Sequence, residues 1–474
     1  FGDNDKAIFG AGSDLQIYHD GSHSRITDAG TGSLLIDGDE VYVRSSTGEN
    51  KIIADTNGGV NLFYDNASKL ATTATGIDVT GTAVTDGLTV AGNVSVDGGT
   101  IKLDGNYPVG TGNVALGFTA FNDMDTGTYN VGIGHEAGYN ITTGSSNTAL
   151  GTASLFSNTT GGSNVAVGRD ALQANTTFNG NVAVGHNALL NTNQNYNTAV
   201  GSNSMQANTS GYINSAFGRS SLQSNTTGIY NTALGAYSLQ SNTTASNNTA
   251  VGYKAGYSNT NQHNAFVGYQ AGMNATSGGG HAYFGSQAGE STTTGADNTG
   301  LGTAALVYNT TGSYNTAVGK FALLSNTTAD YNTAVGYQAG LANTTGANLN
   351  AFGSSALQSN TTGNYNAAFG SNAGRNVTTG SNNTAIGIQS LYSNTTASQN
   401  TAIGYQAGYS NTTGIMNTFI GEQTGRSTTS SDNTFVGRTA GYYVTSGAKN
   451  TILGRYNGNQ GGLDIRTSSN NIVL

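Results

Sequence analysis

A 17-residue period covers about three quarters of this 474-residue chain and constrains its fold more than any other feature. Alignment on Asn-x-Ala-Val-Gly gives twenty-one starts between residues 113 and 450, spaced by 17 residues except for three spacings of 16. A unit with so few apolar residues cannot fold alone, because ordering each residue costs about 1–2 kcal/mol. Stacked units can bury a shared apolar column and pair their backbones. The period therefore predicts an all-β chain, a parallel β-solenoid of about 21 coils.

The columns of the repeat, numbered from the Asn, have distinct predicted roles. Column five is Gly in every copy, which requires either a positive φ or a backbone approach too close for a Cβ. Column one is Asn in nineteen copies, and we expect these amides to bond to one another along the stack. Column four is always Val, Ile, Leu or Phe and is expected to fill the core, helped by column nine where that residue is large. Representatives of columns five and one are Gly168, Gly252, Gly336, Gly404, Asn248, Asn332 and Asn400.

Four segments follow from the change of pattern along the chain. Residues 1–72 are predicted to be an N-terminal β shaft module, and 73–108 a short-strand shaft or linker. The stretch 87–105 alternates apolar and polar residues with Gly, Asn and Asp at the breaks, which indicates short strands joined by tight turns. Residues 109–455 are the predicted solenoid. Residues 456–474 are expected to cap its last edge or to remain as a stump after cleavage.

Charge and composition exclude several classes of function. The net charge of −9 lies in residues 1–112, which hold fifteen acids and six bases, whereas residues 113–474 hold ten of each. The repeats therefore offer no basic stripe for nucleic acid and no polybasic membrane signal. The chain has no Cys, and no apolar run approaches the length of a membrane span.

The small number of core residues per coil favours association of the predicted solenoid with copies of itself. With one or two core residues per coil, a single chain is expected to be poorly filled. Association with copies of itself would complete the core, and three-fold winding is the closed arrangement we favour. We therefore expect an intertwined homotrimeric fibre.

Three stretches resemble known families of fibrous proteins. "FGDNDKAIFGAGSDLQIYHDGSHSRITDAGTGSLLI" and "NLFYDNASKLATTATGIDVTGTAVTDGLTVAGNV" resemble shaft modules of tail fibres from marine, cyanophage-like tailed bacteriophages. The repeat, with "NTAVGYQAG", resembles the head repeats of trimeric autotransporter adhesins, which form a left-handed parallel β-roll in a trimer, although the unit is longer here. "LDIRTSSNNIVL" is similar to the segment before the endosialidase-type intramolecular chaperone. That resemblance implies self-cleavage close to Leu474 by a domain outside this sequence, so no catalytic residue is carried over.

Tyrosines in column six are the candidate glycan contacts. Aromatic rings flanked by Asn and Gln suit a sugar-binding face, because rings stack on apolar sugar faces while amides bond hydroxyls. Stacking of the rings between adjacent coils, as a stabilising device, is the alternative and is favoured by the absence of Trp. The column-six candidates are Tyr253, Tyr269, Tyr337 and Tyr405.

Other polar residues have structural explanations that we favour. The nearest approaches to a carboxylate pair are Glu290 with Asp297 and Glu422 with Asp432, both interpreted as solvated loop residues rather than a hydrolase site. The pairs His19 with His23 and His135 with His186 are interpreted as surface turns rather than metal ligands. The acidic runs 3–6 and 37–40 lack the spacing of a calcium loop. We expect no enzyme activity, metal or cofactor.

Asn-Thr-Thr or Asn-Thr-Ser recurs at column twelve in eleven copies. Glycosylation requires a secretory machinery, whereas Asn and Thr also serve turns by bonding their own backbone, and we favour the turn. These Asn residues are Asn158, Asn175, Asn208, Asn225, Asn242, Asn309, Asn326, Asn343, Asn360, Asn394 and Asn411.

The sequence thus predicts a structural fibre and receptor-binding protein of a phage tail, located on the virion. Its expected partners are copies of itself, host cell-surface polysaccharide, and other virion proteins through a segment upstream of Phe1. A bacterial trimeric cell-surface adhesin is the alternative, and an ice-binding solenoid is a third reading.

Overall fold

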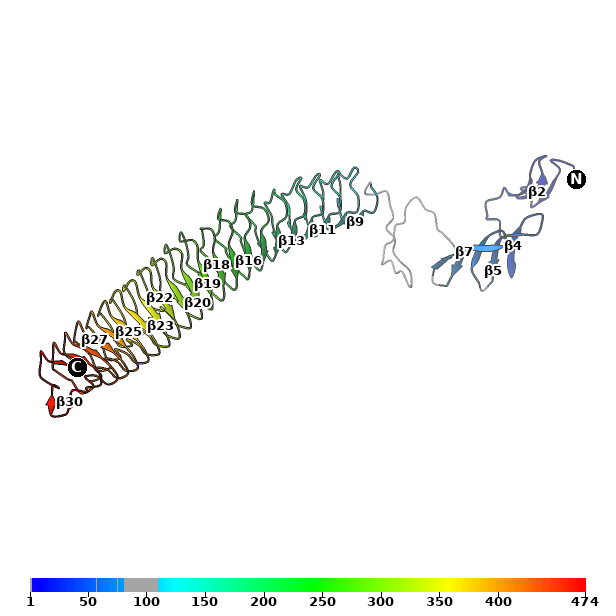
Figure 1. Ribbon diagram of the computed structural model, residues 1–474. Helices are drawn as coiled ribbons and strands as arrows, with labels where there is room; N and C mark the ends of the chain where they lie inside the picture. Colours follow the sequence, from blue (N-terminus) through cyan, green and yellow to red (C-terminus); the bar gives the residue numbers. More distant parts are fainter. Residues whose placement is uncertain (1, 57, 75, 81–109) are drawn as a thin grey trace. The chain divides into compact units, whose positions relative to one another are not determined.

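The computed structural model describes residues 2–56, 58–74, 76–80 and 110–474, and the chain divides into two units, Phe1–Ile101 and Lys102–Leu474 (Figure 1). The described residues form strands and turns and contain no helix, and hence none that could cross a membrane. The predicted strands of 87–105 lie outside the described residues.

The first unit consists of two antiparallel sheets. β1, β2 and β3 form one sheet in that order, and β4 to β8 form the other. The strands are β1 (Lys6–Phe9), β2 (Leu15–His19), β3 (Ser24–Asp28), β4 (Glu40–Arg44), β5 (Asn50–Asp55), β6 (Val60–Tyr64), β7 (Ala67–Thr73) and β8 (Gly76–Val79). None of the described residues of this unit is buried, although its strands are rich in apolar side chains. The described residues of this unit therefore form no buried core.

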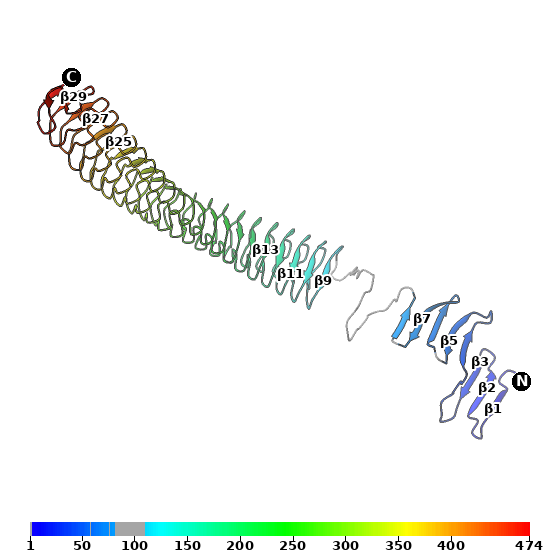
Figure 2. The ribbon, with the colours of Figure 1, turned by 90° about the horizontal axis from the view of Figure 1, so that it is seen from below.

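The second unit is the predicted parallel β-solenoid, with one three-residue strand per coil. β9 to β29 pair in chain order, every pair is parallel and in register, and β32 extends the stack next to β29 (Figure 2). Columns two to four form each strand. The strands are β9 (Val114–Leu116), β10 (Val131–Ile133), β11 (Thr148–Leu150), β12 (Val165–Val167), β13 (Val182–Val184), β14 (Thr198–Val200), β15 (Ser215–Phe217), β16 (Thr232–Leu234), β17 (Thr249–Val251), β18 (Ala265–Val267), β19 (Ala282–Phe284), β20 (Thr299–Leu301), β21 (Thr316–Val318), β22 (Thr333–Val335), β23 (Asn350–Phe352), β24 (Ala367–Phe369), β25 (Thr384–Ile386), β26 (Thr401–Ile403), β27 (Thr418–Ile420), β28 (Thr434–Val436), β29 (Thr451–Leu453), β30 (Asn459–Gln460), β31 (Leu463–Asp464) and β32 (Ile472–Val473).

Column three, and not column four, is the core position of the strand. Ala334 in column three is fully buried, whereas Val335 in column four is only partly buried and Ile403 in the same column is exposed. Successive strand residues point to opposite faces, so columns two and four lie outside together. The expectation that column four fills the core was wrong. Its bulky residues instead stack on their equivalents in adjacent coils, as Phe352 and Phe369 do with ring centroids 4.8 Å apart.

A single chain fills its own solenoid core. In the coil that begins at Asn332, columns one, three, eight, nine, twelve and fifteen are all buried. Most of these residues are Ala, Gly or Asn, so the coil is narrow and closes without help. The premise that one chain would be poorly filled was wrong for this unit. The packing of the solenoid core therefore gives no reason to expect a trimer.

Column five needs glycine for both of the predicted reasons. Gly336 has φ +141°, and a Cβ added there would lie 2.5 Å from the carbonyl oxygen of Gly353 in the next coil. The same contact to the next column-five Gly recurs along the stack, for example at Gly168 and Gly404. Left-handed geometry and close packing of adjacent coils therefore exclude a side chain at this position.

Column nine alternates between Gly and a large residue because it shares space with column three. Where column three is Ala, column nine can be a buried Leu, such as Leu172. Where column three is Phe419, column nine of the same coil is Gly425, and a Cβ there would lie 2.4 Å from the Phe419 ring. No coil has a large residue in both columns. Where both are small, as at Ala334 and Gly340, a Cβ added at Gly340 would lie 3.0 Å from Leu323 of the preceding coil.

The column-one Asn residues form a buried ladder. The backbone N–H of Asn332 donates to Asn315 Oδ1 at 3.0 Å, and Asn332 Oδ1 accepts from the N–H of Leu349 at 2.9 Å. The bond along the stack therefore joins a side chain to the next backbone, and direct amide-to-amide bonds occur in only some coils, such as Asn400 to Asn383 at 3.3 Å. These bonds satisfy backbone groups that a buried turn would otherwise leave unpaired.

Candidate functional surfaces

The four candidate tyrosines of column six lie on the outside of the solenoid. Tyr253, Tyr269, Tyr337 and Tyr405 are between 41% and 50% exposed. Column-seven glutamines follow three of them, and Gln406 Nε2 donates to Gln389 Oε1 at 2.9 Å. The arrangement provides half-exposed rings next to amide groups, as a sugar-binding face requires.

Some of these rings also stack between coils. The rings of Tyr253 and Tyr269 lie 5.7 Å apart and 16° from parallel, so each covers one face of the other. Tyr337 meets Phe321 at a tilt of 52°, with centroids 6.4 Å apart. Tyr405 makes no ring contact within the described part of the chain. Stabilising stacks and open rings therefore coexist in one column.

The column-twelve Asn residues point into the core. Asn343 is fully buried, and its Nδ2 donates to Asn326 Oδ1 at 2.9 Å and to the carbonyl of Gly346 at 2.8 Å. Asn360 continues the ladder by donating to Asn343 Oδ1 at 2.9 Å. All eleven Asn residues of this motif are buried. A glycan on any of them is incompatible with the folded coil.

The candidate histidines and carboxylates are held in separate local contacts. His23 pairs with Asp20 at 3.7 Å in the β2–β3 turn, and His186 Nε2 lies 2.8 Å from Arg169. Glu290 accepts from Gln287, and Glu422 forms an ion pair with Arg438 at 3.2 Å. His19 contacts Ser24, and His135 lies beside Glu136. No group of three or more His, Asp or Glu side chains within the described ranges is placed to hold a metal ion.

One hollow of the first unit is acidic. It has a volume of about 570 Å³ and is lined by Asp39, Glu40, Asp55, Thr56 and Gly58. Asp39 belongs to the acidic run 37–40. None of the described residues that line the hollow is basic. Clustered carboxylates alone do not define a site, and we assign none.

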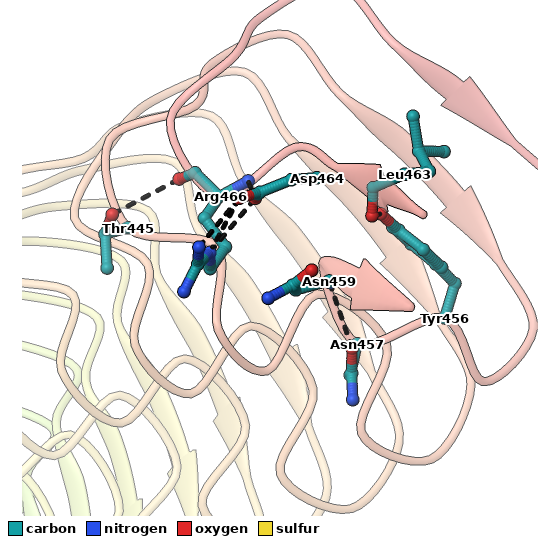
Figure 3. Close-up of polar contacts among 7 residues, drawn as sticks. All are labelled: Thr445, Tyr456, Asn457, Asn459, Leu463, Asp464 and Arg466. Carbon is teal, nitrogen blue, oxygen red and sulfur yellow. Dashed lines mark hydrogen bonds and ion pairs between the residues drawn. The ribbon is translucent and has the colours of Figure 1, made fainter. Parts of the chain in front are cut away.

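The last coil holds three hollows that the sequence analysis did not find. Asn471 repeats column one 21 residues after Asn450, and its N–H donates to Asn450 Oδ1 at 2.9 Å. The four residues beyond the 17-residue period are accommodated by the antiparallel β30–β31 hairpin, which spans residues 459–464 (Figure 3). The signal was present in the sequence, since Asn-Ile-Val at 471–473 repeats the start of a coil at an unusual spacing.

Polar contacts fix the walls of these hollows. Tyr456 Oη donates to the carbonyl of Leu463 at 2.6 Å, and Arg466 Nη2 pairs with Asp464 at 2.7 Å (Figure 3). Hydrogen bonds from the Arg466 side chain lower the pKa of the Asp464 carboxyl. Thr445 Oγ1 donates to the carbonyl of Arg466 at 3.2 Å and ties the segment to the preceding coil.

Comparison with protein-family models, curated proteins and solved structures found no match. The resemblances to phage fibres and to adhesin heads therefore stay predictions.

Proposed function

We propose that this chain is a structural fibre and receptor-binding protein of a phage tail, which contacts host surface glycans without catalysis. The observation that carries the proposal is the unbroken in-register stack with half-exposed tyrosines on its outside. Twenty-one coils at about 4.8 Å each give a rod of about 100 Å. Such a rod projects from its base and repeats its surface chemistry along its length, which suits adhesion.

Weak contacts repeated along the rod would add up. Tyr253, Tyr269, Tyr337 and Tyr405 lie on one column, so a single polysaccharide strand could meet several rings. Linked contacts raise overall affinity without any single tight site. A surface of this kind suits a repeating polymer rather than a small molecule.

The proposed fibre is a homotrimer because of its first unit rather than its solenoid. Leu35 and Tyr64 are 74% and 72% exposed, and no described residue of that unit is buried. Small sheets need a covered apolar face for independent stability, and burial gives about 25 cal/mol per Å² of apolar surface. Parallel copies of the same chain would supply that cover. The exposed apolar residues of column four would add to the contact.

Mass photometry of the purified chain tests the assembly. We expect particles of three times the 48.0 kDa chain mass. A monodisperse monomer would contradict the trimer while leaving the solenoid intact.

A glycan array of bacterial O-antigen and capsular polysaccharides tests receptor binding. The variant with Tyr253, Tyr269, Tyr337 and Tyr405 changed to Ser is expected to lose most of its binding. As a matched control, Ser at Tyr314 and Tyr331 removes a stacked pair in column seventeen, with centroids 5.0 Å apart, and should leave binding unchanged. Equal loss in both variants, or no binding by the unmodified chain, would refute the proposal. Shortening of a bound polysaccharide would show an enzyme instead.

A bacterial surface adhesin would use the same rod, and the gene sequence flanking this segment distinguishes the two. Ice binding finds partial support in column two, which is Thr in twelve coils and faces outward. The adjacent column four is bulky and apolar, so the face does not form a double row of hydroxyls. Absence of thermal hysteresis in a purified sample would exclude this alternative.

A further inference from the structure

The three hollows of the last coil share lining residues, and we refer to them together as the groove. The first, of about 640 Å³, is lined by Thr439, Arg455, Tyr456, Asn457 and Gln460. The second, of about 160 Å³, shares Thr439 and Asn457 with it and adds Tyr442 and Tyr443. The third, of about 360 Å³, shares Tyr443 and continues to Ser427, Thr445, Asp464, Arg466 and Thr467. The groove exists because the β30–β31 hairpin departs from the regular coil.

An aromatic pair lies at the centre of this groove. The rings of Tyr442 and Tyr443 meet edge to face, with centroids 4.7 Å apart and an angle of 76°. Tyr443 is 51% exposed, so part of its ring is open to a ligand. A half-exposed tyrosine ring can stack against the apolar face of a sugar.

Free hydrogen-bonding groups flank the aromatic pair. Asn457 and Gln460 use their side-chain oxygens within the hairpin region, where Asn457 Oδ1 accepts from Asn459 N–H at 3.0 Å. Neither Asn457 Nδ2 nor Gln460 Nε2 makes a hydrogen bond within the described chain. These two amide groups remain available as donors to sugar hydroxyls.

The charges that line the groove do not cancel. Arg466 is neutralised by its ion pair with Asp464, whereas Arg455 has no carboxylate partner among the described residues. Arg455 is exposed and lines the first hollow. Arginine presents two parallel N–H donors to a carboxylate or sulfate, which makes it selective for such groups.

We propose that this groove binds an anionic oligosaccharide, with the acidic group on Arg455 and a sugar ring on Tyr443. The inference rests on the proposed function in taking a glycan as the ligand, but it concerns a single site of defined chemistry rather than the repeated tyrosine column. Carboxylate and sulfate share the required geometry.

Isothermal titration calorimetry on the full chain tests the groove with three probes: oligogalacturonate, its fully methyl-esterified form, and a sulfated galactan oligosaccharide. We expect at least one acidic probe to bind. The neutral ester is expected to bind with an affinity lower by about tenfold or more, the usual effect of removing a charge-assisted hydrogen bond. Tighter binding of oligogalacturonate identifies a carboxylate ligand, and tighter binding of the galactan identifies a sulfate ligand.

Variants separate the groove from general electrostatics. Arg455→Gln should lower the affinity for the acidic probe about tenfold, and Arg455→Lys should lower it less. Tyr443→Ser should lower the affinity for both the acidic and the neutral form. Arg219→Gln is the matched control, since Arg219 occupies the same column six within the regular coils and lies over Tyr237. Equal effects of the Arg455 and Arg219 changes, or equal binding of the acid and its ester, would overturn the proposal. If the chain binds glycans of the bacterial array but none of these probes, the groove proposal is refuted and the proposed function is not.

Discussion

His281 is the one residue in column one that replaces the ladder amide with a titratable ring. The backbone N–H of His281 donates to Asn264 Oδ1 at 3.0 Å, and its ring Nδ1 accepts from the backbone N–H of Asn298 at 3.3 Å. The ring also stacks on buried Tyr283, with centroids 4.8 Å apart. Because Nδ1 must accept this bond, only the neutral ring fits the ladder. A proton on Nδ1 would face the N–H of Asn298.

Burial lowers the pKa of His281 to about 4 from its ordinary 6.5, against an opposing attraction from the Asp297 carboxylate. The unfolded chain therefore binds a proton more readily than the folded chain. The stability linked to this group is present above about pH 6.5 and is lost as the pH falls toward 4. At 1.36 kcal/mol per pKa unit, the full loss is about 3 kcal/mol.

The perturbation is His281→Asn, which restores the ladder amide and removes the titration. Solenoids can open in segments, so amide hydrogen exchange of the coils around Asn298 is a sharper measurement than a global melt. Between pH 7.5 and 4.5, we expect the opening free energy of these coils to fall by about 2 to 3 kcal/mol more in the natural chain than in the variant.

The control is His135→Asn, which changes a half-exposed histidine in column six. It should leave the pH dependence of the Asn298 coils unchanged. Parallel pH profiles for the natural chain and His281→Asn would refute the reasoning, because the buried ring would then carry no linked stability.

Three further substitutions test the roles of the columns by chemical denaturation. Gly336→Ala should lower the free energy of unfolding by about 2 kcal/mol or more, because the new Cβ meets backbone atoms. Gly461→Ala, with φ +61° and no atom within 4 Å, should lower it by only about 1 kcal/mol. Asn343→Ala should cost about 1–3 kcal/mol by leaving buried groups unpaired, and no loss would show that the ladder is not needed. Gly425→Leu alone should overpack the core by about 1–3 kcal/mol, and adding Phe419→Ala should recover much of that cost; additive losses would contradict the shared volume.

The period and the glycine of column five were predictable because the backbone geometry of the coil requires them. Any coil of 17 residues must turn at the same places, and a position such as Gly336 that excludes a Cβ is visible as an invariant residue. The interior role of the Asn columns was only partly predictable. Asn343 suits a turn both in solution and in a buried ladder, and residue type alone does not separate the two.

Residue type alone did not predict which face of the strand points into the core. A three-residue strand has two possible faces, and Val335 is a better core candidate than Ala334 by size. The packing reverses this preference, because column three faces inward and holds a large residue only where column nine is Gly, as at Phe419. The groove of the last coil was harder still, since it is formed by a departure from the repeat.

The inward and outward columns obey different constraints, and this separation bears on function. Inward columns admit few residue types because each must fit the residues that it packs against, as Gly425 fits Phe419 of the same coil. Outward columns six and ten hold Tyr, Arg, Lys, Gln, Ser and Glu in different coils without any change in strand register. Each coil contacts only its nearest neighbours, so a change in one coil acts mainly on the coils beside it. A binding surface can therefore change coil by coil while the rod that carries it stays the same.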